Sequence, residues 1–259
     1  MKKALILGVL AILAISGITA EDKGYDIAKK SDDLKEPTTS VMVGSMKIVD
    51  QSGAIRMRQM NMYTKKIAGG DESFIEIKEP ADVAGTKFLS IPVVGGETDQ
   101  RLYLPALKKV RKIASGGQSG EFVNSDFSYY DLDDHQFADF TYKFLSEGDT
   151  IADAAFAGMK FYRVESVPKK SNAPYSRTIL WINMDDFYTY RIETFDKADD
   201  SPWKIISVTK VERINNMMIG TQTYVENRKR NSKTFLQASD LKIDTQLPAD
   251  IFSVKGLEK

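Results

Sequence analysis

The sequence predicts a mainly β fold, built as one strongly curved antiparallel sheet of about eleven strands with a few short helices. After residue 39, short runs rich in Val, Ile, Tyr, Phe and Thr alternate with turns that contain Gly, Asn, Asp or Pro, and helical periodicity is scarce. Most connections are shorter than the crossover of about a dozen residues that a parallel pair requires. Neighbouring strands should therefore be antiparallel.

The elements follow one another without an internal repeat or a linker. Residues 22–35 can form one helix that carries Ile27 and Leu34, and Pro37 ends it. A turn or short helix is expected over residues 248–257. We therefore expect a single domain over residues 21–259. Eleven to thirteen strands are predicted, over residues 40–50, 54–64, 73–79, 87–93, 100–104, 108–114, 137–146, 159–167, 177–184, 187–196, 203–212, 217–228 and 233–243.

The first twenty residues have the pattern of a secretory leader. Lys2 and Lys3 precede an apolar run from Ala4 to Ile15, and the next five residues are mostly small. The sequence therefore predicts a signal peptide, residues 1–20, cleaved after Ala20. A membrane anchor is the alternative, although about 17 apolar or small residues lie at the lower limit for crossing ~30 Å of hydrocarbon.

Composition excludes several kinds of chemistry. The chain has no cysteine, one histidine, and 36 basic and 36 acidic residues among 259. Without cysteine there is no disulfide, thiol nucleophile or thiolate metal site, and one histidine cannot build a multi-histidine metal cage. The balanced charge gives no general attraction to nucleic acid. We expect no metal, no cofactor and no nucleic-acid partner.

Some predicted strands are apolar on both faces. In residues 177–184, alternation places Ile179 and Trp181 on one face. Leu180 and Ile182 occupy the other face. A curved sheet can use its inner face for a ligand or for covering helices, and its outer face for packing or for a partner. An ordinary two-sheet sandwich is the alternative.

Methionine is concentrated near the start of the predicted sheet. Five of the ten methionines lie between Met42 and Met62, and Met217 and Met218 are adjacent in a later strand. Flexible, polarisable thioether side chains suit surfaces that accept apolar partners of variable shape, such as acyl chains. The alternative is that these methionines simply fill the core.

The search for catalytic residues finds no nucleophile with its base. His135 follows Asp133 and Asp134, but no Gly-x-Ser-x-Gly turn is present, so we interpret His135 as an exposed loop residue. The paired aspartates at predicted turns are favoured there by side-chain hydrogen bonds to the backbone. The sequence therefore predicts no catalytic site and no enzyme.

Several segments stand in a characteristic order along the chain. They are residues 60–65 (MNMYTK), 79–89 (EPADVAGTKFL), 102–113 (LYLPALKKVRKI) and 126–132 (DFSYYDL), followed by residues 168–169, 175–177, 181–182 and 195–196 with Lys204. Their combined order resembles the outer-membrane lipoprotein-sorting protein family, a LolA-like group of exported bacterial proteins. The resemblance covers most of the chain after the leader.

This resemblance implies an incomplete, half-open β-barrel of the LolA/LolB type whose apolar cavity holds acyl chains. It implies a monomeric periplasmic carrier of a lipoprotein or lipid, active in outer-membrane biogenesis alongside an RND-type inner-membrane exporter. A periplasmic lipid sensor that regulates a partner without net transport is the alternative. Apolar strand residues near the matching segments are the predicted cavity lining: Met42, Met46, Met60, Met62, Ile75, Ile77, Leu89, Trp181 and Met218.

A partner surface is also predicted around residues 103–112 and the loop 126–132. Tyr combined with Lys and Arg is typical of docking faces. The alternative is internal packing of the aromatic residues, with lysines protecting a sheet edge. The predicted docking residues are Tyr103, Lys108, Lys109, Arg111, Lys112 and Tyr129.

Overall fold

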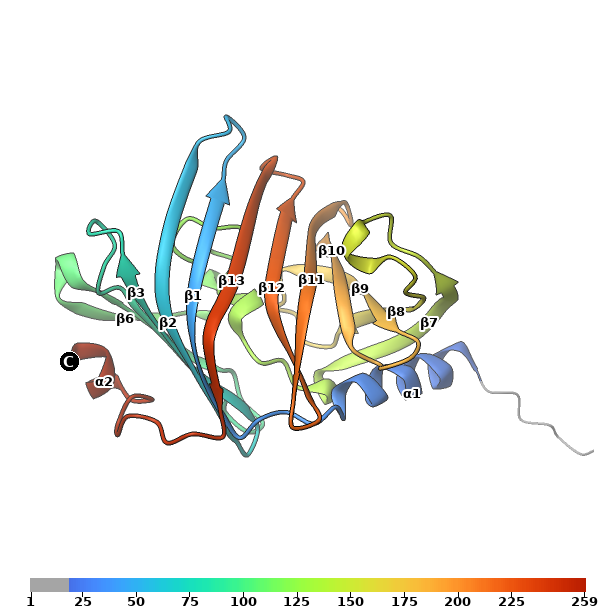
Figure 1. The fold of residues 1–259 in the computed structure, drawn as a ribbon, viewed down its shortest axis with the longest axis horizontal. Coiled ribbons are helices and arrows are strands. Elements are labelled where there is room, and N and C mark those ends of the chain that lie inside the picture. Colours follow the sequence, from blue (N-terminus) through green and yellow to red (C-terminus); the bar gives the residue numbers. More distant parts are fainter. Residues whose placement is uncertain (1–18) are drawn as a thin grey trace, which may run out of the picture.

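The computed structural model describes residues 19–259, which fold into thirteen strands and two α-helices (Figure 1). The prediction of a mainly β protein with a curved antiparallel sheet is confirmed, although the strands number thirteen rather than about eleven. Each predicted run overlaps one strand. The elements are α1 (Ala20–Asp32), β1 (Thr39–Val49), β2 (Ile55–Ile67), β3 (Gly70–Glu79), β4 (Lys87–Ile91), β5 (Asp99–Leu104), β6 (Lys109–Ile113), β7 (Phe140–Asp149), β8 (Phe161–Pro168), β9 (Tyr175–Asn183), β10 (Thr189–Asp196), β11 (Pro202–Ile214), β12 (Met217–Asn227), β13 (Ser232–Ile243) and α2 (Val254–Glu258).

All thirteen strands belong to one open antiparallel sheet, in the order β6-β5-β4-β3-β2-β1-β13-β12-β11-β10-β9-β8-β7. Most neighbours in the sheet are also neighbours in the chain. The exception is β1, which pairs with β13 and joins the first six strands to the last seven; Ser45, for example, lies opposite Gln237. The two-sheet sandwich is therefore not the fold of this protein.

The sheet curves around residues 114–139, called here the inner segment, which connects β6 to β7 (Figure 1). Gln100 of β5 donates a hydrogen bond from Nε2 to the carbonyl oxygen of Tyr129, over 2.9 Å. Tyr175 of β9 donates from its hydroxyl to Asp131, over 2.5 Å. Because β5 and β9 lie near opposite ends of the sheet, both can reach this segment only if the sheet bends. The face toward the inner segment is called the inner face.

Helix α1 covers the inner face of β7, β8 and β9. The helix begins with a capping box, in which the Asp22 amide donates to Thr19 Oγ1 over 3.1 Å and the Thr19 amide donates to the Asp22 carboxylate. Ile27 is buried against the sheet. A Cβ atom on Gly24 would lie 2.4 Å from the backbone nitrogen of Phe144, so glycine permits the close approach of helix and strand.

The predicted leader lies outside the described residues, except for Thr19 and Ala20 at the start of α1. No helix within residues 19–259 is both long enough and apolar enough to cross a membrane.

Two further segments cover parts of the outer face. At one end, Leu257 of α2 packs with Phe74 and Leu89. Toward the other end, residues 150–159 place Phe156 in a cluster whose border includes Trp181. These covers explain why strands such as β9 are apolar on both faces, since each face meets a different layer.

Candidate ligand-binding site

An apolar cavity of about 310 Å³ lies between the end of α1, the inner segment and the inner face of β7 to β11. Leu180, Ile192 and Ile206 form a row across its floor, because they are register partners on three adjacent strands and so point to one face. The apolar and aromatic side chains around this cavity are Tyr130, Phe137, Phe140, Tyr142, Pro168, Tyr175, Leu180, Ile192 and Ile206. We call it the apolar cavity.

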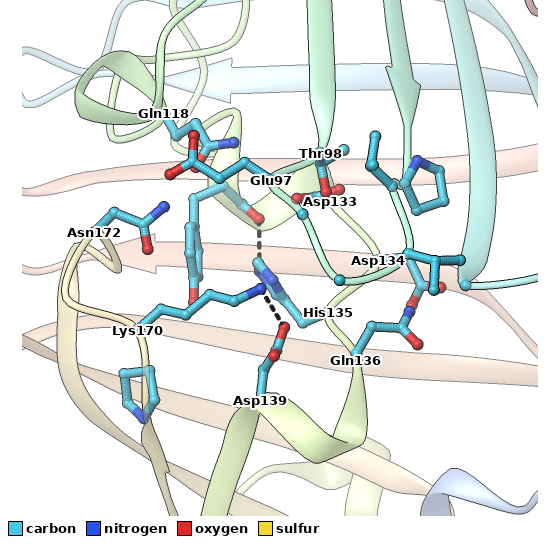
Figure 2. Close-up of a pocket in the computed structure, with 18 of the residues that line it drawn as sticks. Glu97, Thr98, Gln118, Asp133, Asp134, His135, Gln136, Asp139, Lys170 and Asn172 are labelled. Atoms are coloured by element: carbon cyan, nitrogen blue, oxygen red, sulfur yellow. Dashed lines mark hydrogen bonds and ion pairs between the residues drawn. The ribbon is translucent and has the colours of Figure 1, made fainter.

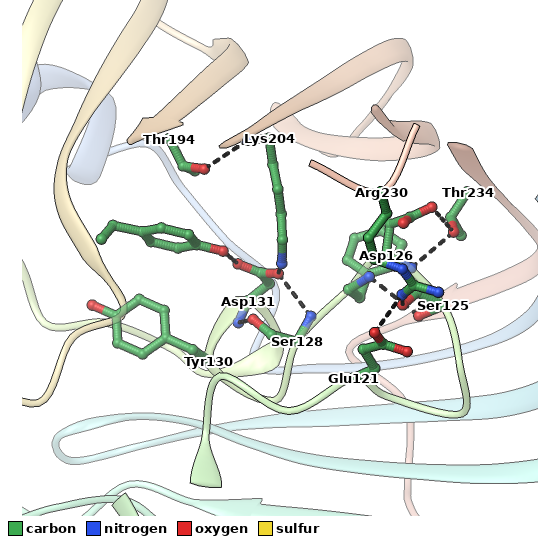
Figure 3. Close-up of polar contacts among 12 residues, drawn as sticks. Glu121, Ser125, Asp126, Ser128, Tyr130, Asp131, Thr194, Lys204, Arg230 and Thr234 are labelled. Atoms are coloured by element: carbon green, nitrogen blue, oxygen red, sulfur yellow. Dashed lines mark hydrogen bonds and ion pairs between the residues drawn. The ribbon is translucent and has the colours of Figure 1, made fainter. Parts of the chain in front are cut away.

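A buried ion pair lies beside the apolar cavity (Figure 3). Lys204 Nζ of β11 is 2.7 Å from Asp131 Oδ2, and each side chain is only 3% exposed. The Asp131 carboxylate also accepts from the Tyr175 hydroxyl and from the Ser128 amide, the latter over 2.8 Å. Burial and the Asp131 charge hold the pKa of Tyr175 well above its usual value. These contacts fasten the inner segment to β9 and β11.

A second polar anchor fastens the inner segment to β13 (Figure 3). The buried Asp126 carboxylate accepts from the hydroxyls of Ser232, over 2.5 Å, and Thr234, over 2.8 Å. Arg230 bridges the same region, since its guanidinium lies 2.6 Å from Glu121 and donates to a backbone carbonyl of the inner segment. Hydrogen bonding of this kind offsets the cost of removing the carboxylate from water.

A second cavity of about 160 Å³ adjoins the apolar cavity. We call it the polar cavity because most of its lining residues are polar (Figure 2), although Pro92, Val93 and Val94 also line it. The wall common to both is formed by Tyr130, Asp133, His135, Phe140 and Pro168. His135 Nε2 lies 3.0 Å from the Tyr130 carbonyl oxygen, and the two rings are 4.0 Å apart. His135 is therefore half-buried between the cavities and is not the exposed loop residue that the sequence suggested. Other polar side chains around this cavity are Glu97, Thr98, Gln118, Asp134, Gln136, Asp139, Lys170 and Asn172.

Carboxylates outnumber cations in and beside the polar cavity. Burial raises the pKa values of Asp133 and Asp134. Neighbouring Asp71, whose amide donates to Asp134, has its pKa raised to about 6 by burial and then by repulsion from Asp134. Among the described residues that line this cavity, Lys170 is the one lysine, and it is paired with Asp139 over 2.8 Å. Within residues 19–259 no group of three or more acidic or histidine side chains is arranged to hold a metal ion.

Most of the predicted cavity residues lie on the inner face but outside the apolar cavity. Met46, Met60, Ile75 and Ile77 are buried in one cluster, and Met62 packs against it. Met42 is the register partner of Met62 and shares its face. The inner segment covers this cluster with Phe122 and Phe127. In this structure these side chains contact protein, and their contact with a ligand stays a prediction.

The other three predicted cavity residues lie on the outer face. Leu89 packs beneath Leu257 of α2, and Trp181 and Met218 border the cluster around Phe156. The nine residues thus do not form one surface. The residues that do line the apolar cavity come mainly from β7 to β11 and from positions 130–140. Of the patterns in the sequence, only the apolar alternation around Leu180 could have indicated the residues that line this cavity.

The predicted docking residues are also divided by the structure. Lys108, Lys109, Arg111 and Lys112 are exposed along and beside β6. Tyr103 packs in the outer-face cluster beneath α2, and Tyr129 packs between Phe88 and Phe122 inside the sheet. Tyr129 therefore does not share a surface with the cations, whereas Tyr103 lies on the same face of the sheet as Lys112 and is partly covered there.

The fold is that of a LolA-like class of proteins, as comparison with solved structures shows. An outer membrane lipoprotein-sorting protein domain from Vibrio parahaemolyticus is 25% identical, with a TM-score of 0.84, over 92% of this chain and all of that one. A DUF1329 family protein from Desulfovibrio piger is 27% identical, with a TM-score of 0.85, over 92% of this chain and 99% of that one. A LolA superfamily protein from Nitrosomonas europaea shares the fold, with 20% identity and a TM-score of 0.70 over 93% of this chain and all of that one.

The resemblance predicted from the sequence is therefore confirmed. A family model described as "Uncharacterized protein" matches residues 69–259, more than half of the chain, and the protein belongs to that family. No curated protein matches the sequence significantly.

Proposed function

We propose that this protein is a periplasmic carrier that binds acyl chains of a lipid or lipoprotein and moves them across the cell envelope. The observation that carries the proposal is the apolar cavity on the inner face, which is bounded by the end of α1 and by the inner segment and adjoins the polar cavity. This order of environments matches an amphiphile, whose apolar chain continues into a polar group.

The apolar cavity can supply the binding energy without any reaction. Its volume, about 310 Å³, lies at the lower end of the roughly 300–1,000 Å³ range of ligand cavities. Each methylene removed from water contributes about 0.8 kcal/mol, so ten methylenes contribute about 8 kcal/mol before the entropy lost on binding is subtracted. We therefore propose a binding function and no catalytic one.

The polar cavity is the proposed place for the polar part of the cargo. It shares a wall that includes Tyr130 and His135 with the apolar cavity, so a chain that passes this wall brings its polar group next to carboxylates and amides. Those groups can form the hydrogen bonds that the cargo loses when it leaves water.

The proposal also includes the export of the protein to the periplasm and the partner with which it works. The description of the Vibrio parahaemolyticus structure supports lipoprotein sorting as the process. The leader pattern supports export, with cleavage after Ala20. We propose that the mature protein is a monomer that exchanges its cargo with an RND-type inner-membrane exporter.

Filling the apolar cavity tests the binding claim. Thr178 lines the cavity from β9, so Thr178→Trp should occupy the space of the chain. Thr141 is exposed on the opposite face of β7, and Thr141→Trp is the matched control. Each protein is purified without detergent, and bound lipids are identified by mass spectrometry. We expect bound acyl chains to fall at least about tenfold in Thr178→Trp and to be unchanged in the control.

Transfer between vesicles tests the carrier claim. Labelled lipid in donor vesicles should reach acceptor vesicles faster with the wild-type protein than with Thr178→Trp. Binding without any acceleration of transfer would favour the sensor alternative, and the absence of bound acyl chains from the wild-type protein would refute the proposal.

A further inference from the structure

The two edges of the sheet are protected differently. At one edge, α1 packs along β7, Lys23 pairs with Glu147 over 2.8 Å, and two irregularities interrupt the ladder between β7 and β8. At the other edge, β6 pairs with β5 on one side only. Within residues 19–259 no other backbone hydrogen bond reaches residues 109–113. The outward backbone groups of β6 are therefore free to pair with another strand.

Positive charge is concentrated on this free edge. Lys109, Arg111 and Lys112 lie on β6, and Lys108 precedes them in a left-handed conformation with φ 48°. All four side chains are exposed. The only acidic group within 4 Å of any of them, among the described residues, is Asp99, 3.5 Å from Lys112 Nζ. The edge therefore has an excess of positive charge in a chain whose total charge is zero.

The positive charges on and beside β6 determine which kind of strand can pair with it. A second copy of β6 would bring lysine and arginine against lysine and arginine, and like charges directly opposite each other destabilise a strand pair. An acidic strand would instead place carboxylates opposite the cations. Nearby Leu107 is half exposed and offers an apolar contact at one end of the edge.

We propose that β6 is a docking edge for an extended acidic segment of a partner protein, which adds a strand to the sheet. Main-chain hydrogen bonds supply affinity in this mode of recognition, and the side chains supply specificity. The proposal uses neither cavity and does not depend on the carrier function.

The probe for this proposal is a peptide of four alternating Val-Glu repeats, added to the purified full-length mature protein. Its affinity is measured by fluorescence anisotropy, and its position by hydrogen–deuterium exchange of residues 109–113. Two comparison peptides separate charge from strand pairing. One has lysine in place of glutamate, and the other keeps glutamate but carries N-methyl groups on alternate amides, which removes the donors for main-chain pairing.

Charge reversal supplies the matched variants. Lys109→Glu, Arg111→Glu and Lys112→Glu are combined in one protein, and its control reverses three exposed lysines on interior strands, Lys47, Lys210 and Lys242. We expect the edge variant to bind the acidic peptide at least about tenfold more weakly and the basic peptide more tightly. The control should bind the acidic peptide as the wild-type protein does.

The expected pattern is slower exchange at residues 109–113 with the acidic peptide and at least about tenfold weaker binding of its N-methylated form. Equal binding of both acidic peptides would show a purely electrostatic contact and overturn strand addition. Binding to phosphatidylglycerol vesicles, with no binding of any peptide, would assign the edge to a membrane surface and also overturn the proposal.

Discussion

Removing the lysine of the buried ion pair should strongly destabilise the protein. In Lys204→Met the Asp131 carboxylate stays buried without a cation, although the Tyr175 hydroxyl and the Ser128 amide still donate to it. Breaking one partner of such a pair costs about 3–5 kcal/mol. Because the two remaining hydrogen bonds stabilise the carboxylate, we expect the free energy of unfolding to fall by an amount near the lower limit of this range, about 3 kcal/mol.

Removing the negative charge of Asp131 as well should recover part of the lost free energy of unfolding. In the double variant with Asp131→Asn, no charge remains in the site, and the amide oxygen can still accept a hydrogen bond. The expected loss for the double variant is about half of that for Lys204→Met alone. Lys23→Met is the matched control, since Lys23 forms an ion pair of similar length with Glu147 but at the surface. Exposed pairs contribute at most about 1 kcal/mol.

Urea unfolding followed by circular dichroism measures the free energy of unfolding of each variant. The slope of that free energy against urea should be the same in all of them, because the surface exposed on unfolding hardly changes. If Lys204→Met lowers the free energy of unfolding no more than Lys23→Met does, burial does not strengthen the Lys204–Asp131 ion pair. The idea that this ion pair fastens the inner segment is then refuted.

Two further predictions concern the polar cavity and the helix. The pKa of Asp71 is raised to about 6, which means that the folded state favours the protonated carboxyl group. The free energy of unfolding is therefore higher at low pH, and this contribution of Asp71 is lost as the pH rises through 6. Asp71→Asn should therefore raise the Tm at pH 8 and change it little at pH 4; an equal difference at both would contradict the assignment. Gly24→Ala should destabilise the protein by about 1–3 kcal/mol in urea despite the better helix propensity of alanine, because its Cβ meets the backbone of Phe144. Lys30→Ala, at an exposed position of α1, is the control and should cost less than about 0.5 kcal/mol.

The approximate positions of the strands and of the first helix could be predicted from the sequence. Those signals are local: β-branched and aromatic runs, turn residues between them, and Pro37 after a helical stretch. Short connections also determined that neighbours are antiparallel. The number of strands could not be derived from the sequence alone, because short runs such as residues 108–114 are weak signals and count as strands only when they pair.

Which face of each strand meets which layer depends on how the strands and the covering segments pack in three dimensions. Phe88 and Leu89 are adjacent and both fully buried, yet Phe88 packs beneath the inner segment and Leu89 beneath α2. Alternation separates such residues but cannot say which face is the inner one. Bulges shift the pattern further, as between Val208 and Lys210, before β12 places Met218 on the outer face.

The position of the inner segment could not be derived from the sequence either. Its glycines and aspartates are typical of a surface loop, yet it lies inside the curved sheet and forms part of the wall of both cavities. It is held there by long-range polar contacts, such as Asp131 with Lys204 and Asp126 with Thr234, which join residues 73 and 108 positions apart. Pairings over such distances leave no periodic signal in the sequence, and the candidate site depends on them.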